Sequence, residues 1–388
     1  MCAVNSKLGQ NIAAFVLNDI LTLALWWLSG SIVFWVEFVM MKAALVLTLV
    51  YLLHCEGAVV VQSEEVVLND RPIIGILSQE QSFYLHTKYP EENYTSYIAA
   101  SYVKDVESAG ARVVPIMIGR DRSYYENIMS KINGVLLPGG ATFFNQSNGY
   151  ADAGQHIYEI AQKLNDQGDY FPIFGTCLGF ELLVILASGR GKVENRIRCY
   201  SYGNLPLAFT NDFRSSKMFK NAPEDVIQLL ANEDITVNVH QFCIVDENLK
   251  KYNLTKSWRA TSYSNDYFGI KFIASFENKK YPFYGVQFHP EKVAYEWKLS
   301  KNHPHTAEAV KANRYFMDFF VSECRKNFHT FTDVAEENQY LIYNYKPYFT
   351  GVLGSAFLQC YLFEPRGAVS NNINPLIGQR YQPNQSDD

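Results

Sequence analysis

The stretch FPIFGTCLGFE (171–181) joins a short apolar run to an apolar segment with helical spacing. We expect a strand over 171–174, a helix over 178–187 and Cys177 in the sharp turn between them. The glycines two residues before and after Cys177 permit such a turn, because glycine has no side chain to obstruct the backbone. A nucleophile on a turn of this kind stands above the edge of a sheet. A buried structural cysteine in a glycine-containing turn is the alternative.

Short apolar segments recur on both sides of this turn, and they alternate with longer segments of helical period. Such alternation predicts an α/β fold, with a mostly parallel central sheet and helices on both faces. Gly110 follows the first expected helix and suits the left-handed conformation of a C-terminal cap. The expected strands are 72–77, 112–118, 133–137, 268–276, 283–288 and 339–345, and the other expected helices are 97–108, 150–164 and 306–325.

The first 58 residues differ from the rest of the chain. Residues 12–39 are apolar and rich in tryptophan, and Met41-Lys42 precedes a second apolar run, 43–53, which ends in small and polar residues. A short positive start, about ten apolar residues and a small-residue exit are typical of a secretory signal peptide. The simplest interpretation is that translation begins at Met41 rather than Met1. The alternative is a membrane anchor at 12–39, a segment roughly long enough to span a bilayer.

Other features fit an exported chain. Asn-x-Ser/Thr sequons occur at Asn93, Asn145, Asn253 and Asn384, and with an export signal they favour glycosylation in the secretory pathway. The five cysteines after the signal are Cys177, Cys199, Cys243, Cys324 and Cys360. Their odd number leaves at least one thiol unpaired in an oxidising compartment, although spacing does not reveal which cysteines pair. A formal net charge of -5 argues against nucleic acid as the main partner.

A cysteine nucleophile needs a proton carrier, and His289 is the best candidate. It lies in YGVQFHPE (284–291), just after an expected strand, where an α/β sheet presents its active edge. Glu291, two residues later, is placed to accept a hydrogen bond from the imidazole. We expect the helix N-terminus after Cys177 to lower the thiol pKa, and the Leu178 N–H to face a developing oxyanion. LPGG (137–140) is a second loop whose bare backbone can approach a substrate, or else an ordinary turn.

In this order, PGG, GTCLG and QFHPE resemble the class I glutamine amidotransferase superfamily, which has a flavodoxin-like sandwich and a Cys-His-Glu triad. Within it the chain is similar to the γ-glutamyl hydrolases, which act on folate polyglutamates. The similarity covers about 70–363, so we expect a leader (1–58), a catalytic domain (70–363) and a disordered tail (364–388). The more specific matching segments are RPIIGILSQE (71–80), YIAASYVKDVESAGARVVPI (97–116), INGVLLPGGA (132–141), NVHQF (238–242), YGVQFHPEK (284–292) and LIYNYKPYFTG (341–351).

The resemblance implies a role for each matching position. Cys177 is the nucleophile, His289 the base and acid, and Glu291 the third member of the triad. Gly140 and Leu178 supply oxyanion-hole amides. Glu181 and His240 match positions used around the substrate, although each is equally compatible with a structural role: Glu181 in pairing on the helix, and His240 in the core.

The implied reaction is hydrolysis of γ-glutamyl bonds in folylpolyglutamates through a thioester, without a metal or other cofactor. The sequence has no cluster of zinc-ligand spacing and no nucleotide-binding glycine loop. A homodimer, and a lysosomal or extracellular location, are also implied. Two other functions remain open: a glutaminase that supplies ammonia to a synthetase, and a non-catalytic secreted glycoprotein of the same fold. The basic residues that bind the glutamate tail, and the choice of endo- or exo-cleavage, are not apparent from the sequence.

Overall fold

The computed structural model describes residues 40–46, 67–81, 83–88, 93–189 and 195–364. The chain separates into two units, Met1–Val66 and Val67–Asp388. In the first unit, residues 40–46 are helical. Within the described ranges, no helix is both long and apolar enough to cross a bilayer. The predicted anchor at 12–39, the predicted signal peptide beyond residue 46 and residues 365–388 of the predicted tail lie outside the described residues.

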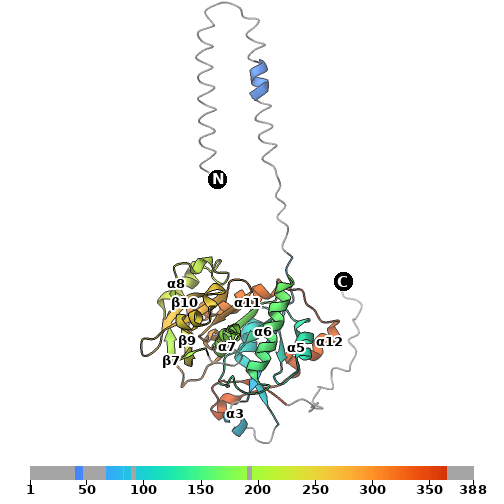
Figure 1. The fold of residues 1–388 in the computed structure, drawn as a ribbon, viewed down its shortest axis with the longest axis vertical. Helices are drawn as coiled ribbons and strands as arrows, with labels where there is room; N and C mark the ends of the chain where they lie inside the picture. The colour runs from blue at the N-terminus through green and yellow to red at the C-terminus, as the bar shows by residue number, and fades with distance from the viewer. Residues whose placement is uncertain (1–39, 47–66, 82, 89–92, 190–194, 365–388) are drawn as a thin grey trace, which may run out of the picture. The chain divides into compact units, whose positions relative to one another are not determined.

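An eight-stranded sheet forms the centre of the second unit (Figure 1). Its strand order is β4-β1-β5-β6-β12-β11-β10-β8; the first five strands are parallel and the last three pair antiparallel. The predicted α/β class with a mostly parallel sheet is therefore confirmed. In that order the strands span Arg112–Ile116, Ile73–Leu77, Gly134–Leu137, Ile173–Thr176, Phe283–Val286, Lys271–Asn278, Trp258–Asn265 and Ala208–Phe209.

Two hydrophobic cores lie on opposite faces of this sheet. Alternate side chains of β1 divide between them: Ile74 and Ile76 join one core, whereas Ile73 and Leu77 join the other. A strand that is buried on both faces is apolar throughout, which explains the unbroken IIGIL run. Helices α4 (Ala100–Ser108) and α11 (Ala307–Cys324) belong to the first core. The second core contains α5 (Arg122–Met129), α6 (Tyr150–Asp166) and α7 (Leu178–Ala187).

Smaller elements complete the unit. A four-stranded antiparallel sheet runs in the order β13-β14-β3-β2, and β7 pairs with β9 as a separate ribbon. These strands span Pro347–Tyr348, Cys360–Phe363, Ser96–Ala99, Gln79–Glu80, Ile197–Leu205 and Thr236–Cys243. The remaining helices are α3 (Phe83–Lys88), α8 (Glu224–Asn232), α9 (Asp246–Lys251), α10 (Pro290–Tyr295) and α12 (Val334–Tyr340).

The expected helix over 97–108 is wrong at its start. Residues Ser96–Ala99 form strand β3, and helix α4 begins only at Ala100. The strand exists because β14, from the end of the domain, pairs with it along its length. This pairing is invisible in the local helical spacing. Gly110 follows the helix with φ of 86°, as its cap position predicts.

The expected strand over 339–345 is also wrong. Helix α12 continues to Tyr340, and Ile342–Asn344 forms a turn of 3₁₀ helix. The Asp333 side chain accepts a hydrogen bond from the Glu336 N–H, so the helix is capped at a position that the sequence analysis overlooked. Strand β11 likewise begins at Lys271 rather than 268, because the Asp266 side chain folds the preceding residues into a turn.

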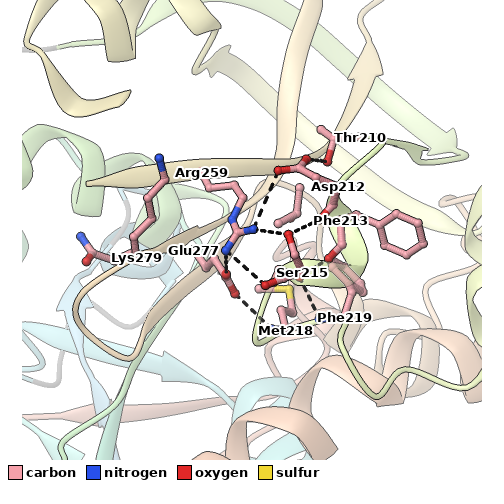
Figure 2. A network of polar contacts seen from close by, with 12 residues as sticks. Thr210, Asp212, Phe213, Ser215, Met218, Phe219, Arg259, Glu277 and Lys279 are labelled. Carbon is pink, nitrogen blue, oxygen red and sulfur yellow. Dashed lines mark hydrogen bonds and ion pairs between the residues drawn. The ribbon is translucent and has the colours of Figure 1, made fainter. Parts of the chain in front are cut away.

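An ion pair with a buried carboxylate joins the segment 210–219 to the antiparallel half of the sheet (Figure 2). Arg259 on β10 lies 3.1 Å from the Glu277 carboxylate on β11, and it also donates to the Ser215 hydroxyl over 2.6 Å. The other Glu277 oxygen accepts the Met218 N–H. Because Glu277 is only 1% exposed, these partners offset the cost of removing its carboxylate from water.

Candidate active site

Cys177 lies in a strained turn between β6 and α7. Its φ of 50° and ψ of -103° fall outside the regions that side-chain-bearing residues ordinarily adopt. Its N–H donates to the Val286 carbonyl over 2.8 Å, and its carbonyl accepts the Glu181 N–H over 2.9 Å. The backbone on both sides of the thiol is therefore fixed, by a strand on one side and by the first turn of α7 on the other.

The two glycines of the turn are required by close packing. A Cβ on Gly179 would lie 2.0 Å from the Leu137 carbonyl oxygen of β5. A Cβ on Gly175 would lie 2.7 Å from the Gly179 carbonyl carbon. Both contacts are with backbone, which has no room to move aside. The glycines thus let α7 start directly against the sheet, and the strained positive φ falls on Cys177 itself.

His289 reaches the same place from the end of β12. Its backbone N–H donates to the Val237 carbonyl over 2.8 Å, which fixes the start of α10. Gly139 lies beside both residues. A Cβ added to Gly139 would lie 2.7 Å from His289 Cε1 and 3.1 Å from Cys177 Cβ. The two side chains, 112 positions apart in the sequence, therefore flank one spot beside the LPGG loop.

Glu291 holds the far side of the imidazole. Its Oε1 lies 2.7 Å from His289 Nδ1, and both side chains are almost completely buried. The hydrogen bond to Nδ1 leaves Nε2 as the ring nitrogen for proton exchange at the thiol. The structure thus brings Cys177, His289 and Glu291 into one site.

Tyr102 on α4 joins the imidazole to the glycine loop. Its hydroxyl lies 3.2 Å from His289 Nδ1 and accepts the Gly139 N–H over 2.9 Å. Beyond Gly139, the Gln79 amide and the Tyr150 hydroxyl both donate to the Pro138 carbonyl, at 2.9 Å and 2.8 Å. These bonds fix the backbone of the LPGG loop.

The two predicted oxyanion donors directly follow Gly139 and Cys177 in the chain. Gly140 follows the loop residue that Tyr102 holds, and a Cβ on it would lie 1.7 Å from Gln79 Oε1, so a larger residue there would force the Gln79 side chain to move. Leu178 is the first residue of α7, and its backbone N–H points toward the Cys177 sulfur. An N–H at the start of a helix is suited to stabilising negative charge.

Burial dominates the electrostatics of the pair. Desolvation raises the pKa of the Cys177 thiol, and the Glu181 and Glu291 carboxylates add to the rise. Desolvation lowers the pKa of His289, although Glu291 opposes this shift. The resting pair at neutral pH is therefore a neutral thiol beside a neutral imidazole. The expected lowering of the thiol pKa by the helix N-terminus is wrong, because lost hydration outweighs the helix dipole.

Glu181 is connected to Cys177 through the side chain of Gln287. The Gln287 amide nitrogen is 3.8 Å from Cys177 Sγ and donates to Glu181 Oε1 over 3.0 Å. The other Glu181 oxygen is 2.6 Å from the buried Arg196 guanidinium. Glu181 is thus adjacent to the site, with its carboxylate engaged by protein groups on both oxygens.

His240 is buried on the β7–β9 ribbon. Its Nε2 lies 3.1 Å from Asn238 Oδ1, and its ring packs edge-on against Phe272. Burial lowers the pKa of His240 to about 3, so the ring is neutral. Behind it, Cys199 and Cys243 form a disulfide, which leaves Cys177 as a free thiol, together with Cys324 and Cys360.

Three residues of this site were missed in the sequence. Gln287 belongs to the QFHPE motif and Tyr102 to the segment 97–116, so both lie in stretches already singled out. Neither shows a local signal of its role. Arg196 precedes a ribbon that the sequence analysis did not predict, and only the tertiary fold brings it to Glu181. Among the described residues, no group of three or more His, Cys, Asp or Glu side chains is arranged to hold a metal ion.

Comparison with protein families gives a match to the model described as Peptidase C26, over residues 72–291. The matched range includes Cys177, His289 and Glu291. Curated proteins named gamma-glutamyl hydrolase are also similar. Those from Bos taurus and Homo sapiens are 42% and 41% identical over 76% of this chain and 90% of their own lengths. Gamma-glutamyl hydrolase B from Dictyostelium discoideum is 39% identical over 73% of this chain and 80% of its own length.

We predict that His289 titrates below its ordinary value of 6.5 and that Glu291→Gln lowers its pKa further. The carboxylate favours the imidazolium, so removing its charge makes the charged ring harder to form. NMR titration of histidine-labelled protein, assigned with His289→Asn, measures both values. Glu308→Gln, an exposed change on α11, is the control and leaves the titration unchanged. A His289 midpoint above 6.5, or a rise in Glu291→Gln, contradicts the electrostatic account.

Proposed function

The chain belongs to the peptidase C26 family, with the curated gamma-glutamyl hydrolases among its relatives, and we propose that it cleaves folylpoly-γ-glutamates with Cys177 as nucleophile. The chain is a γ-glutamyl hydrolase. Its products are glutamate or short polyglutamates and a shortened folate. Antifolate polyglutamates carry the same bond and belong to the same substrate class.

One observation carries the proposed chemistry. The Cys177 and His289 side chains meet beside Gly139: a Cβ added to Gly139 would lie 3.1 Å from Cys177 Cβ and 2.7 Å from His289 Cε1. Glu291 orients the imidazole through Nδ1. A free thiol, a neutral base and an oriented carboxylate are the groups that acyl transfer through a cysteine requires.

The proposed acylation uses each group once. Cys177 Sγ attacks the γ-carbonyl carbon while its proton passes to His289 Nε2. The oxyanion accepts hydrogen bonds from the Gly140 and Leu178 N–H groups. The C–N bond then breaks, and His289 returns the proton to the departing amine. A thioester remains on Cys177.

Deacylation repeats the same path with water. The water attacks the thioester carbon, and His289 takes its proton. The C–S bond breaks, and the proton returns to the sulfur. Since burial raises the pKa of Cys177 and lowers that of His289, proton transfer accompanies attack, rather than preceding it as a stable ion pair.

The first test is cleavage of pteroyl-γ-pentaglutamate. We predict that Cys177→Ala lowers kcat by at least about a thousandfold, because no other group replaces the nucleophile. Cys360→Ala is the matched control: it removes another buried free thiol and leaves kcat within about twofold. Liquid chromatography of the products measures both rates. Undiminished cleavage by Cys177→Ala contradicts the mechanism, and faster release of ammonia from free glutamine than of glutamate from the pentaglutamate favours a glutaminase instead.

We also propose that the chain matures in the secretory pathway and acts in lysosomes or outside the cell. The Cys199–Cys243 disulfide supports this, because disulfides persist in oxidising compartments. Asn93, Asn145 and Asn253 are exposed, as glycan acceptors must be. Asn384, the fourth predicted acceptor, lies outside the described residues.

Glycosylation is testable in a secreting animal cell line. We predict that peptide N-glycosidase F lowers the apparent mass of the secreted protein. The triple change of Asn93, Asn145 and Asn253 to Gln reproduces most of that loss, and Gln at the exposed non-sequon Asn232 is the control. Retention of unglycosylated protein in the cytosol contradicts the proposed location.

A further inference from the structure

The β7–β9 ribbon presents a set of polar and aromatic side chains on one face. Arg198 pairs with Phe242, and Ser201 pairs with His240, with an irregularity between the two pairs. Directly opposed residues of an antiparallel pair point to the same face, and alternate residues of β9 share a face. Arg198, Phe242 and His240 therefore lie on one face of the ribbon.

Two guanidinium groups lie over the Phe242 ring. The Cζ of Arg196 is 3.9 Å from the ring centroid, and that of Arg198 is 4.4 Å away. Arginine on an aromatic face is held in place by cation–π attraction and stacking. The ring thus keeps two positive charges close together and limits their rotamers.

The two arginines differ in what balances their charge. Arg196 is buried and lies 2.6 Å from the Glu181 carboxylate. Arg198 is exposed, and its guanidinium donates over 3.3 Å to the uncharged Gln241 amide oxygen. Within the described part of the chain, no ion pair involves Arg198. Arg198 is therefore a positive charge at the surface without a carboxylate partner among the described residues.

This charge is connected to the nucleophile by a short series of contacts. Gln287 touches Cys177 Sγ at 3.8 Å and Glu181 at 3.0 Å; Glu181 pairs with Arg196, and Arg196 shares the Phe242 ring with Arg198. A γ-linked glutamate spans about 6 Å, since its backbone has two more bonds than an α-linked residue. Five side-chain contacts therefore separate Arg198 from Cys177. A polyglutamate chain of several residues is long enough to cover such a separation.

We propose that Arg198, stacked on Phe242, binds a free α-carboxylate of the polyglutamate chain at a residue removed from the scissile bond. The proposal rests on the proposed function, and it assigns a specificity residue to that site. A planar guanidinium suits bidentate binding of a carboxylate. Because the shortest substrates do not reach Arg198, it favours longer chains over shorter ones.

Arg198→Gln tests the proposal on pteroyl-γ-diglutamate and pteroyl-γ-hexaglutamate. We predict that KM for the hexaglutamate rises about three- to tenfold while kcat is unchanged. A rise of this size is expected from the loss of one partly exposed hydrogen bond between charged groups. KM and kcat for the diglutamate stay within twofold, which also reports correct folding. Added salt weakens hexaglutamate binding more in the wild type than in Arg198→Gln, because only the wild type makes the Arg198–carboxylate ion pair that salt screens. Arg198→Lys keeps the charge and recovers part of the difference.

Arg314→Gln is the matched control, because Arg314 is also exposed and contacts the Ser108 carbonyl, at the end of α4 away from Tyr102. It leaves both KM values unchanged. Equal KM for the hexaglutamate in Arg198→Gln and wild type, or an equal rise for both substrates, overturns the assignment of Arg198 and leaves the hydrolase function intact. Failure of the wild type to cleave either substrate overturns both.

Discussion

The contact between the start of α7 and strand β5 is the constraint on which the site depends. Gly179 packs so closely on the Leu137 carbonyl that no side chain fits between them. Helix α7 therefore begins immediately after β6, and the one residue between them, Cys177, takes a strained positive φ. The same packing brings the thiol to the edge of the sheet where β5 ends in its glycine loop and β12 delivers His289. Strain at Cys177 is sustained because the surrounding strands leave the chain no alternative path.

The buried site is organised by charge-balanced polar groups. Burial alone would raise the pKa of Glu291, but the His289 ring beside it lowers that pKa, so the carboxylate stays ionised where it orients the ring. Tyr102 ties the same ring to Gly139, and Gln287 ties the thiol to Glu181. Each link passes between elements that are distant in sequence. Burial thus favours a neutral thiol beside a neutral imidazole, and in the proposed mechanism charge separates only when the sulfur attacks the substrate carbonyl.

Local sequence predicted the parts of this arrangement that local physics controls. The apolar runs fixed the positions of the parallel strands, and the glycines around Cys177 predicted the turn. The predictions that failed depend on the tertiary fold. Ser96–Ala99 forms a strand because β14 pairs with it, and the pKa of the Cys177 thiol is raised because the folded domain buries the thiol. NVHQF (238–242) on β9 was singled out by its resemblance, but no local pattern predicted the β7–β9 ribbon or the stacking of Arg196 and Arg198 on Phe242. Its importance appears only when the fold brings it to Glu181.

The central claim is that Cys177 attacks γ-carbonyl carbons with the help of His289. A γ-diazoketone analogue of glutamate tests it directly, because such a reagent alkylates a nucleophile that is held at the γ-carbon and paired with a proton donor. The account predicts one covalent adduct, found on the Cys177 peptide by mass spectrometry, which forms at least about tenfold more slowly in His289→Asn. An adduct on another residue, or a rate that is indifferent to His289, would contradict it.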